Sequence, residues 1–230
     1  MKGSNVMRKY VNLAWVNVII IALLLPILAV LTATTTSAAG TYNYRCDPWA
    51  VEYMEAGKDQ LYLDPAMIRT DARNPITRAE MAVLMVNTMA NVGTGFNHDH
   101  NFHGTNTFTD VPATDVHYDY IECAYAAGVI KGIGDNKFNP NATITRQDAA
   151  VMIARTLTAI NPNRNELSAS PFADDKYIAD YAKESTRILK RYAIAEGVVD
   201  AFDTEKIFNP YGNCKIEEAV KMCLLTIENQ

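Results

Sequence analysis

Three stretches of the chain place apolar residues on one face of a helix at matching positions. Within each stretch these positions recur every three or four residues, which is typical of an amphipathic helix packed on a core. The stretches align at offsets of 68 and then 70 residues. The aligned sets are Met81, Ala149 and Ala219; Leu84, Met152 and Met222; Met85, Ile153 and Cys223; Thr88, Thr156 and Thr226; and Met89, Leu157 and Ile227. The pattern predicts three copies of one helical unit.

Two of these helices have a recognisable start. Thr77 is followed three residues later by Glu80, and Thr145 by Asp148. A threonine oxygen in this position accepts a hydrogen bond from a free amide of the first turn, and the acidic residue suits the positive end of the helix. The third copy has no such threonine, so Asn213 is the candidate cap there.

Each copy also has an earlier apolar stretch that predicts a first helix. A glycine-rich turn, residues 128–134, follows the second of these helices, and Phe138-Asn139-Pro140 returns later as Phe208-Asn209-Pro210. A single helix–loop–helix unit cannot bury its apolar face alone, so the three copies should close around a common core. The sequence therefore predicts an all-α fold. The predicted first helices are 49–57, 116–128 and 181–197, and the three copies are 41–98, 104–166 and 167–230.

Residues 1–39 have the layout of an export signal. Lys2, Arg8 and Lys9 precede an apolar run over residues 13–32, and Ser37-Ala38-Ala39 places small residues before Gly40. The run of about 20 residues is also long enough for an uncleaved membrane anchor. The proline within the run and the small-residue exit favour cleavage.

Charge and motifs exclude several classes of function. Removal of residues 1–39 takes away three cations and changes the net charge from −5 to −8, with 18 Lys and Arg against 26 Asp and Glu. An acidic chain without basic runs argues against nucleic acid and anionic lipid as partners. The sequence has no nucleophile elbow, phosphate-binding glycine loop or zinc-protease helix, so we expect neither an enzyme nor a cofactor.

The four cysteines leave two interpretations open. On one helix, Cys214 and Cys223 would lie about 13 Å apart, which is too far for a disulfide. A disulfide would therefore join distant parts of the chain, such as Cys46 or Cys123. The alternative, which we favour, is that Cys123 and Cys223 are small buried apolar residues.

The second copy resembles the S-layer homology domain. The resemblance rests on Phe108-Thr109-Asp110-Val111-Pro112, Gly128 to Gly132, Phe138-Asn139-Pro140 and Ile144-Thr145-Arg146. The first copy adds Trp49-Ala50 and Ile76 to Glu80, and the third keeps Phe172-Ala173-Asp174 and Phe208-Asn209-Pro210. The resemblance implies a pseudo-threefold helical prism that attaches exported proteins to wall-linked, often pyruvylated, polysaccharide. Val116 replaces the aromatic residue at the position of Trp49, and Ile216 replaces the arginine, so we expect at most two competent grooves.

Arg78 and Arg146 are the candidate residues for recognising an anion. Each follows a helix cap, where the helix dipole disfavours a cation by about 0.3–1 kcal/mol at an exposed site. Beside free helix amides, an arginine provides a bidentate site for a carboxylate such as a pyruvate ketal. The alternative is that each arginine pairs with an acidic residue of the neighbouring copy and holds the copies together. On the first interpretation, replacing either arginine by alanine weakens binding and changes folding little.

The remaining candidates have structural alternatives of their own. Trp49 and Tyr181 are candidate stacking platforms for a sugar ring, or ordinary packing residues. Gly128 and Gly132 allow a ligand to approach the backbone, or only serve the turn. His98, His100 and His103 are weak candidates for a metal site, in a polar insertion that is more typical of a solvated linker.

These observations favour a secreted protein of the cell wall or S-layer that anchors noncovalently to pyruvylated wall polysaccharide. Other S-layer or envelope proteins are candidate partners, and after cleavage of the signal no membrane contact is expected. The alternative function is a structural envelope module that binds another protein and whose glycan grooves no longer function.

Overall fold

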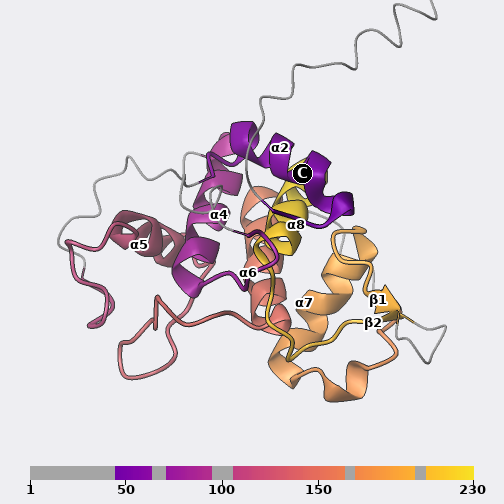
Figure 1. Ribbon diagram of the computed structural model, residues 1–230. Coiled ribbons are helices and arrows are strands. Elements are labelled where there is room, and N and C mark those ends of the chain that lie inside the picture. Colours follow the sequence, from indigo (N-terminus) through magenta and orange to yellow (C-terminus); the bar gives the residue numbers. More distant parts are fainter. Residues whose placement is uncertain (1–44, 64–70, 95–105, 164–168, 200–205) are drawn as a thin grey trace, which may run out of the picture. The chain divides into compact units, whose positions relative to one another are not determined.

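The computed structural model describes residues 45–63, 71–94, 106–163, 169–199 and 206–230. They belong to one compact unit, Asn43–Gln230, and within them the fold is mostly helical (Figure 1). None of the helices among these residues is long and apolar enough to span a membrane. The elements in chain order are η1 (Pro48–Ala50), α2 (Val51–Gln60), α4 (Arg78–Asn91), α5 (Tyr118–Ala126), α6 (Arg146–Ile160), η2 (Asp175–Tyr177), α7 (Asp180–Arg191), β1 (Val198–Val199), β2 (Lys206–Ile207) and α8 (Ile216–Glu228).

The second helices of the first two copies begin where the sequence predicts. The Thr77 hydroxyl accepts a hydrogen bond from the Glu80 amide, and Glu80 accepts one from the Thr77 amide in return, which forms a capping box. Thr145 likewise accepts from the Asp148 amide. The prediction that Asn213 caps α8 is wrong. The cap position there is Lys215, and Asn213 instead accepts a hydrogen bond from the Thr143 hydroxyl.

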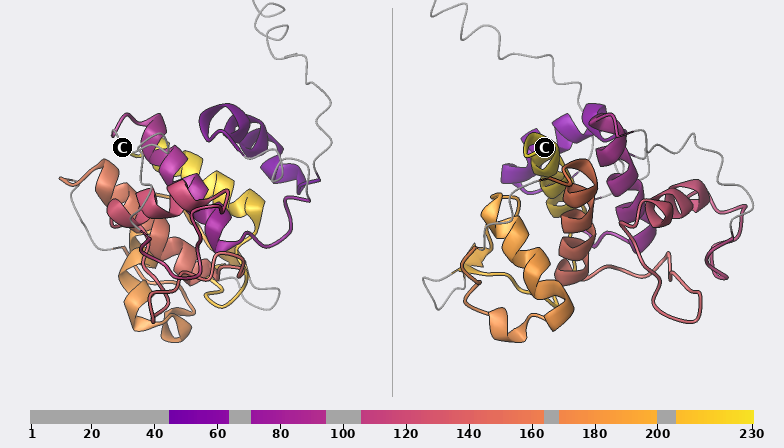
Figure 2. Two further views of the ribbon diagram at one scale, coloured as in Figure 1. Left: turned by 90° about the vertical axis from the view of Figure 1, so that its left-hand side faces the viewer. Right: turned by 180° about the vertical axis from the view of Figure 1, so that it is seen from behind.

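The apolar stripes of α4, α6 and α8 meet in the core. These three inner helices contact one another and lie between the outer helices, which are α2, α5 and α7 (Figures 1 and 2). Each outer helix packs on the inner helix of the preceding copy: α5 on α4, α7 on α6 and, from the first copy, α2 on α8 of the third. Residues such as Met81, Leu84 and Ile153 are completely buried in one continuous cluster. The expectation that Cys123 and Cys223 are buried is confirmed, and all four cysteines are free.

Backbone hydrogen bonds join the segments before the inner helices in a closed ring. The Ile76 amide donates to the carbonyl of Cys214 at 2.9 Å, the Cys214 amide to Ile144 at 2.9 Å, and the Ile144 amide to Ile76 at 3.1 Å. Two further sets repeat the ring through the amides of the first and second residues of these helices. They are Arg78 to Ala142, Arg146 to Gly212 and Ile216 to Asn74, and Ala79 to Pro140, Gln147 to Pro210 and Glu217 to Ala72. The three copies therefore share backbone hydrogen bonds as well as a core.

The repeated Phe-Asn-Pro segments are held by an aspartate of the same copy. Both carboxylate oxygens of Asp110 accept hydrogen bonds at 2.8 Å, from the amides of Phe138 and Asn139. Asp174 holds the third copy in the same way, through the amides of Phe208 and Asn209. The Phe-x-Asp motifs upstream of each loop thus fix the loop that follows.

The predicted end of the third outer helix at Gly197 is wrong. Helix α7 ends at Arg191, and Ala193, with φ +52°, occupies the left-handed position that Gly128, with φ +71°, occupies after α5. Gly197 corresponds instead to Gly132. A Cβ atom on either glycine would lie 2.9 Å from a ring carbon of the preceding Phe-x-Asp phenylalanine, Phe172 or Phe108. The same Cβ atom would lie 2.6 Å from the Lys137 carbonyl oxygen at Gly132 and 2.8 Å from that of Ile207 at Gly197, and Gly197 also has φ +79°. Close packing therefore favours glycine in both copies, and at Gly197 the backbone conformation does so as well.

Candidate functional site

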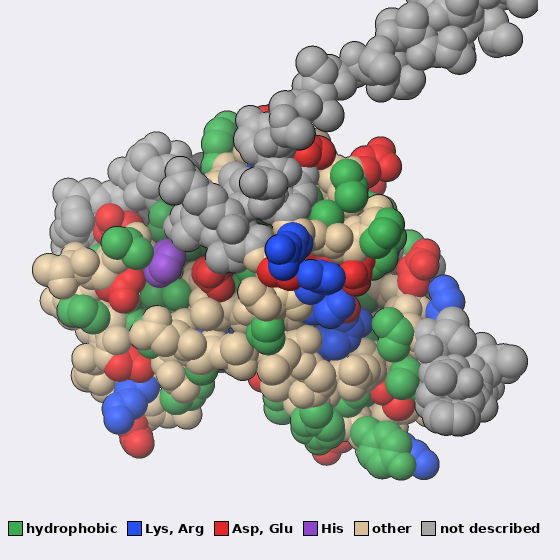
Figure 3. All heavy atoms as spheres, viewed as in Figure 1, with side chains coloured by type: hydrophobic (Ala, Val, Ile, Leu, Met, Phe, Trp, Pro, Cys, Tyr) green, Lys and Arg blue, Asp and Glu red, His purple; other side chains and the backbone are tan. Residues whose placement is uncertain are grey.

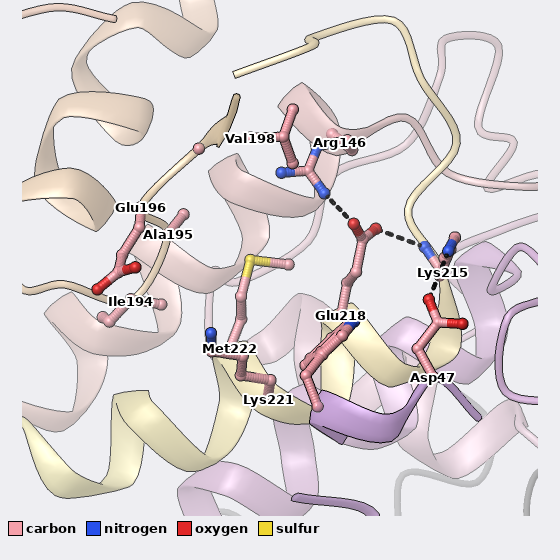
Figure 4. Close-up of a pocket in the computed structure, with 12 residues that line it drawn as sticks. Asp47, Arg146, Ile194, Ala195, Glu196, Val198, Lys215, Glu218, Lys221 and Met222 are labelled. Carbon is pink, nitrogen blue, oxygen red and sulfur yellow. Dashed lines mark hydrogen bonds and ion pairs between the residues drawn. The ribbon is translucent and has the colours of Figure 1, made fainter. Parts of the chain in front are cut away.

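A cavity of about 320 Å³ opens where the three copies meet (Figure 4). Its wall combines the start of the first copy, the first residue of α6, a loop of the third copy and the face of α8. The lining residues are Asp47, Trp49, Arg146, Ile194 to Val198, Lys215, Glu218, Lys221 and Met222. Figure 3 shows basic side chains gathered beside acidic ones near the middle of one face of the protein. Of the six predicted binding residues, the cavity brings together Trp49 and Arg146.

Arg146 is held firmly at the back of this cavity. Its Nη1 atom lies 2.6 Å from Oε1 of Glu218, and its Nε donates to the carbonyl of Phe208 at 2.9 Å. The guanidinium carbon lies 5.3 Å from the centre of the Phe208 ring, within cation–π range. Only 8% of Arg146 is exposed. The arginine therefore joins the second copy to the third, as the alternative interpretation of the sequence proposed.

Trp49 is the aromatic residue that the first copy contributes to the cavity wall. It lies in the short helix η1, which Pro48 begins, and 45% of its surface is exposed. Its ring centre is 6.4 Å from that of Tyr53, and the Lys221 ammonium lies 5.5 Å from it. A large, half-exposed aromatic ring at the edge of a cavity suits stacking on an apolar ligand face.

An ion network that includes two lining residues, Asp47 and Lys215, joins the first copy to the third. Glu217 is fully buried and accepts a hydrogen bond from the Asp47 amide at 2.8 Å. The Lys215 ammonium lies 3.3 Å from both Asp47 Oδ2 and Glu217 Oε1. Burial raises the pKa of Glu217 above its usual range, and the Asp47 carboxylate adds to the rise. The network fixes Asp47, and with it η1 and Trp49, against α8.

Arg78 and Tyr181 lie at a second junction, away from Trp49. Arg78 donates to the carbonyls of Phe138 at 2.8 Å and Lys131 at 3.3 Å, and its guanidinium carbon lies 4.7 Å from the centre of the Phe138 ring. Burial lowers the pKa of Arg78, while the charge of Asp148 opposes the shift. The Tyr181 hydroxyl donates to Asp148 at 2.7 Å, and burial together with this bond raises the pKa of Tyr181 to about 12. The side chain of Tyr181 is 62% exposed.

Comparisons with known proteins find one matching family model and several similar proteins. Residues 107–150 match the family model of the S-layer homology domain. Over 182 residues the chain is 29% identical to an amylopullulanase of Thermoanaerobacterium thermosulfurigenes and 28% identical to exoglucanase XynX of Acetivibrio thermocellus, and over 178 residues it is 28% identical to the surface-layer 125 kDa protein of Lysinibacillus sphaericus. These alignments cover 74–78% of this chain but only 9–15% of the relatives.

Residues 107–150 carry an S-layer homology domain. The match lies in the second copy, where the Phe-x-Asp, glycine-rich and Phe-Asn-Pro segments are all present. The family and its surface-layer relative identify a secreted protein associated with the cell wall or S-layer.

Gly128 and Gly132 of the S-layer homology domain have structural roles and do not line the cavity. Gly128 has a positive φ, which glycine adopts without strain, and Gly132 lies against the Phe108 ring. Their counterpart Gly197, in the third copy, does line the cavity. Val116, at the position of Trp49 and Tyr181, is 81% exposed and offers no ring for stacking.

The histidine candidates for a metal site, His98, His100 and His103, lie outside the described residues. Within the described ranges, no group of three or more His, Cys, Asp or Glu residues is arranged to hold a metal ion.

Sequence reasoning missed part of the cavity wall. Lys221 lines the cavity and aligns with Val83 and Val151 of the other copies. A lysine at a position that is valine in both other copies is the sequence feature that could have indicated it. Glu218 aligns with the acidic residues Glu80 and Asp148 of the other helix starts, but nothing local indicates that it pairs with Arg146. Asp47 gave no sequence signal, because its partner Lys215 is 168 residues away.

Proposed function

We propose that this protein is a noncovalent anchor that binds acidic, pyruvylated wall polysaccharide in the cavity between its copies, and that it catalyses no reaction. The observation that carries the proposal is the joining of Trp49 and Arg146, from different copies, in one cavity of about 320 Å³. Cavities of small-molecule sites begin at about this volume. A short segment of a polysaccharide chain is an appropriate occupant.

The proposal includes closure of three repeats, 41–98, 104–166 and 167–230, into a pseudo-threefold prism. Two features support closure: the ring of backbone hydrogen bonds through Ile76, Ile144 and Cys214, and the packing of α2 on α8. Because the cavity wall takes residues from all three copies, binding requires the closed arrangement.

The chemistry of the wall supports an acidic sugar. Trp49 offers an aromatic face for a sugar ring, and the backbone of the 194–198 loop lies across the cavity. Two of the lining cations, Arg146 and Lys215, are paired with carboxylates of the wall. Lys221 supplies positive charge there, in a chain whose net charge is negative. A carboxylate on the sugar would meet this charge at close range, where it is weakly screened.

A structural envelope module that binds another protein is the second candidate. It is favoured by the engagement of both arginines with the neighbouring copy: Arg78 donates to the Phe138 carbonyl and Arg146 to that of Phe208. Such ties would hold the fold together whether or not a glycan binds. The two functions differ in whether isolated polysaccharide is bound.

Purified protein should bind isolated wall polysaccharide in a pull-down assay and lose most binding when pyruvate is removed from it. Trp49→Ala should weaken binding about tenfold or more, because a buried tryptophan contact commonly contributes about 2 kcal/mol. Tyr177→Ala is the matched control, since Tyr177 is also an exposed aromatic residue in a 3₁₀ helix, η2, outside the cavity. If matrix with polysaccharide retains no more wild-type protein than matrix without it, polysaccharide is not bound. The protein-binding function would then be favoured.

A further inference from the structure

The acidic residues that line the cavity are already neutralised. Glu218 pairs with Arg146 at 2.6 Å, Asp47 with Lys215 at 3.3 Å, and Glu196 with Lys206 at 3.5 Å. Two of the three lining cations, Arg146 and Lys215, are therefore committed to carboxylates of the protein. A ligand anion would have to compete for them.

Lys221 is the lining cation that differs. Within the described part of the chain, its ammonium has no carboxylate partner within 4.0 Å, and it lies 5.5 Å from the ring centre of Trp49 and 5.3 Å from that of Tyr53. Figure 4 shows Lys221 and Glu218 rising from the same helix, α8, at the cavity wall. The two rings hold the ammonium in place without neutralising its charge.

The position of Lys221 is not explained by packing. Val83 and Val151 occupy this position in the other copies, on helices with the same apolar stripe. A lysine there gives up apolar burial and brings a charge to a partly enclosed site, which is costly without a partner. The third copy is also the one whose arginine has been replaced, by Ile216.

We infer that Lys221 is the specificity-determining residue that recognises the acidic group of the bound saccharide, an inference that rests on the proposed function. Arg146 shapes the cavity and holds Glu218, while Lys221 offers the uncompensated charge beside the Trp49 ring. The chemistry recognised is a single anionic substituent on a sugar, a carboxylate or a phosphate. Binding then places the sugar ring at Trp49 and its acidic group at the lysine.

Calorimetric titration of wall polysaccharide fragments into the purified protein tests this role. The fragments are used intact, after removal of pyruvate and after removal of phosphate, which distinguishes the two anions. Lys221→Gln should weaken binding of intact fragments about tenfold, as expected for loss of a charge-assisted contact. Binding of the fragments that lack the recognised anion should be unchanged. Lys221→Arg should retain most of the affinity, because it keeps the charge.

Lys176→Gln is the control for loss of one lysine on an aromatic ring, since Lys176 lies 4.8 Å from the Tyr177 ring centre outside the cavity. It should bind as wild type. Failure of wild type to bind any fragment would overturn the proposed function. Normal binding by Lys221→Gln, or an equal loss for acidic and neutral fragments, would overturn the role of Lys221 and leave polysaccharide binding in place.

Discussion

A chain that lacks residues 168–230 should not fold cooperatively. The deletion removes α8, on which α2 packs and which contacts α4 and α6. It also removes the carbonyl acceptors of three amides, those of Ile76, Arg146 and Gln147. Each buried amide left without a partner costs about 1–3 kcal/mol, and a domain of this size is stable by only about 5–15 kcal/mol in total.

Thermal melting followed by circular dichroism is the measurement, with residues 43–230 as the reference. The reference should give one sharp transition. The shortened chain, residues 43–167, should give a broad transition or aggregate. If the shortened chain instead melts sharply at the reference temperature, the copies are independent units and the closed arrangement is wrong.

Arg146→Ala should lower the free energy of unfolding by about 2–4 kcal/mol, a range set by charge-assisted hydrogen bonds and buried ion pairs. The variant loses the bond to the Phe208 carbonyl and leaves the Glu218 carboxylate, 21% exposed, without its cation. At this chain length the melting temperature should fall by roughly 5–15 °C. The sequence interpretation expected little change in folding, and the geometry reverses that expectation.

Two comparisons separate the ion pair from the other contacts of Arg146. Arg78→Ala should cost less, about 1–2 kcal/mol, because Arg78 bonds two carbonyls and no carboxylate of the described chain. Glu218→Gln in the Arg146→Ala background should recover part of the loss by removing the unpaired charge. Unfolding curves of Arg146→Ala that coincide with wild type would show that the ion pair contributes nothing to the joining of copies.

The helices α4 and α6 could be predicted because the interactions that start and orient them involve residues close together in the chain. Apolar spacing and the threonine caps at Thr77 and Thr145 depend on residues within one or two turns, and the structure places the helix starts at those caps. The third helix start was harder. Because no threonine precedes this helix, the sequence favours a nearby polar residue, Asn213, as its cap. In the structure the cap position is Lys215, and the ring of backbone hydrogen bonds holds the preceding residue, Cys214.

The cavity was only partly predictable because its wall joins residues far apart in the chain. Trp49 and Arg146 stood out through the repeat pattern, but their convergence follows from α2 packing on α8, which no local signal reveals. The end of α7 was misplaced for a similar reason. Ala193 takes a left-handed conformation that a sequence reader assigns to glycine, so the next glycine, Gly197, was mistaken for the helix end.

We expect wall polysaccharide to bind against Trp49. The chain has two tryptophans, Trp15 and Trp49, so in a Trp15→Phe background Trp49 alone reports through its fluorescence. Titration with pyruvylated wall fragments should change the Trp49 emission in a saturable way, with the same midpoint as calorimetric binding, and depyruvylated fragments should have a much weaker effect. Saturable calorimetric binding without any change in Trp49 emission would contradict the account, because the polysaccharide would then occupy another surface.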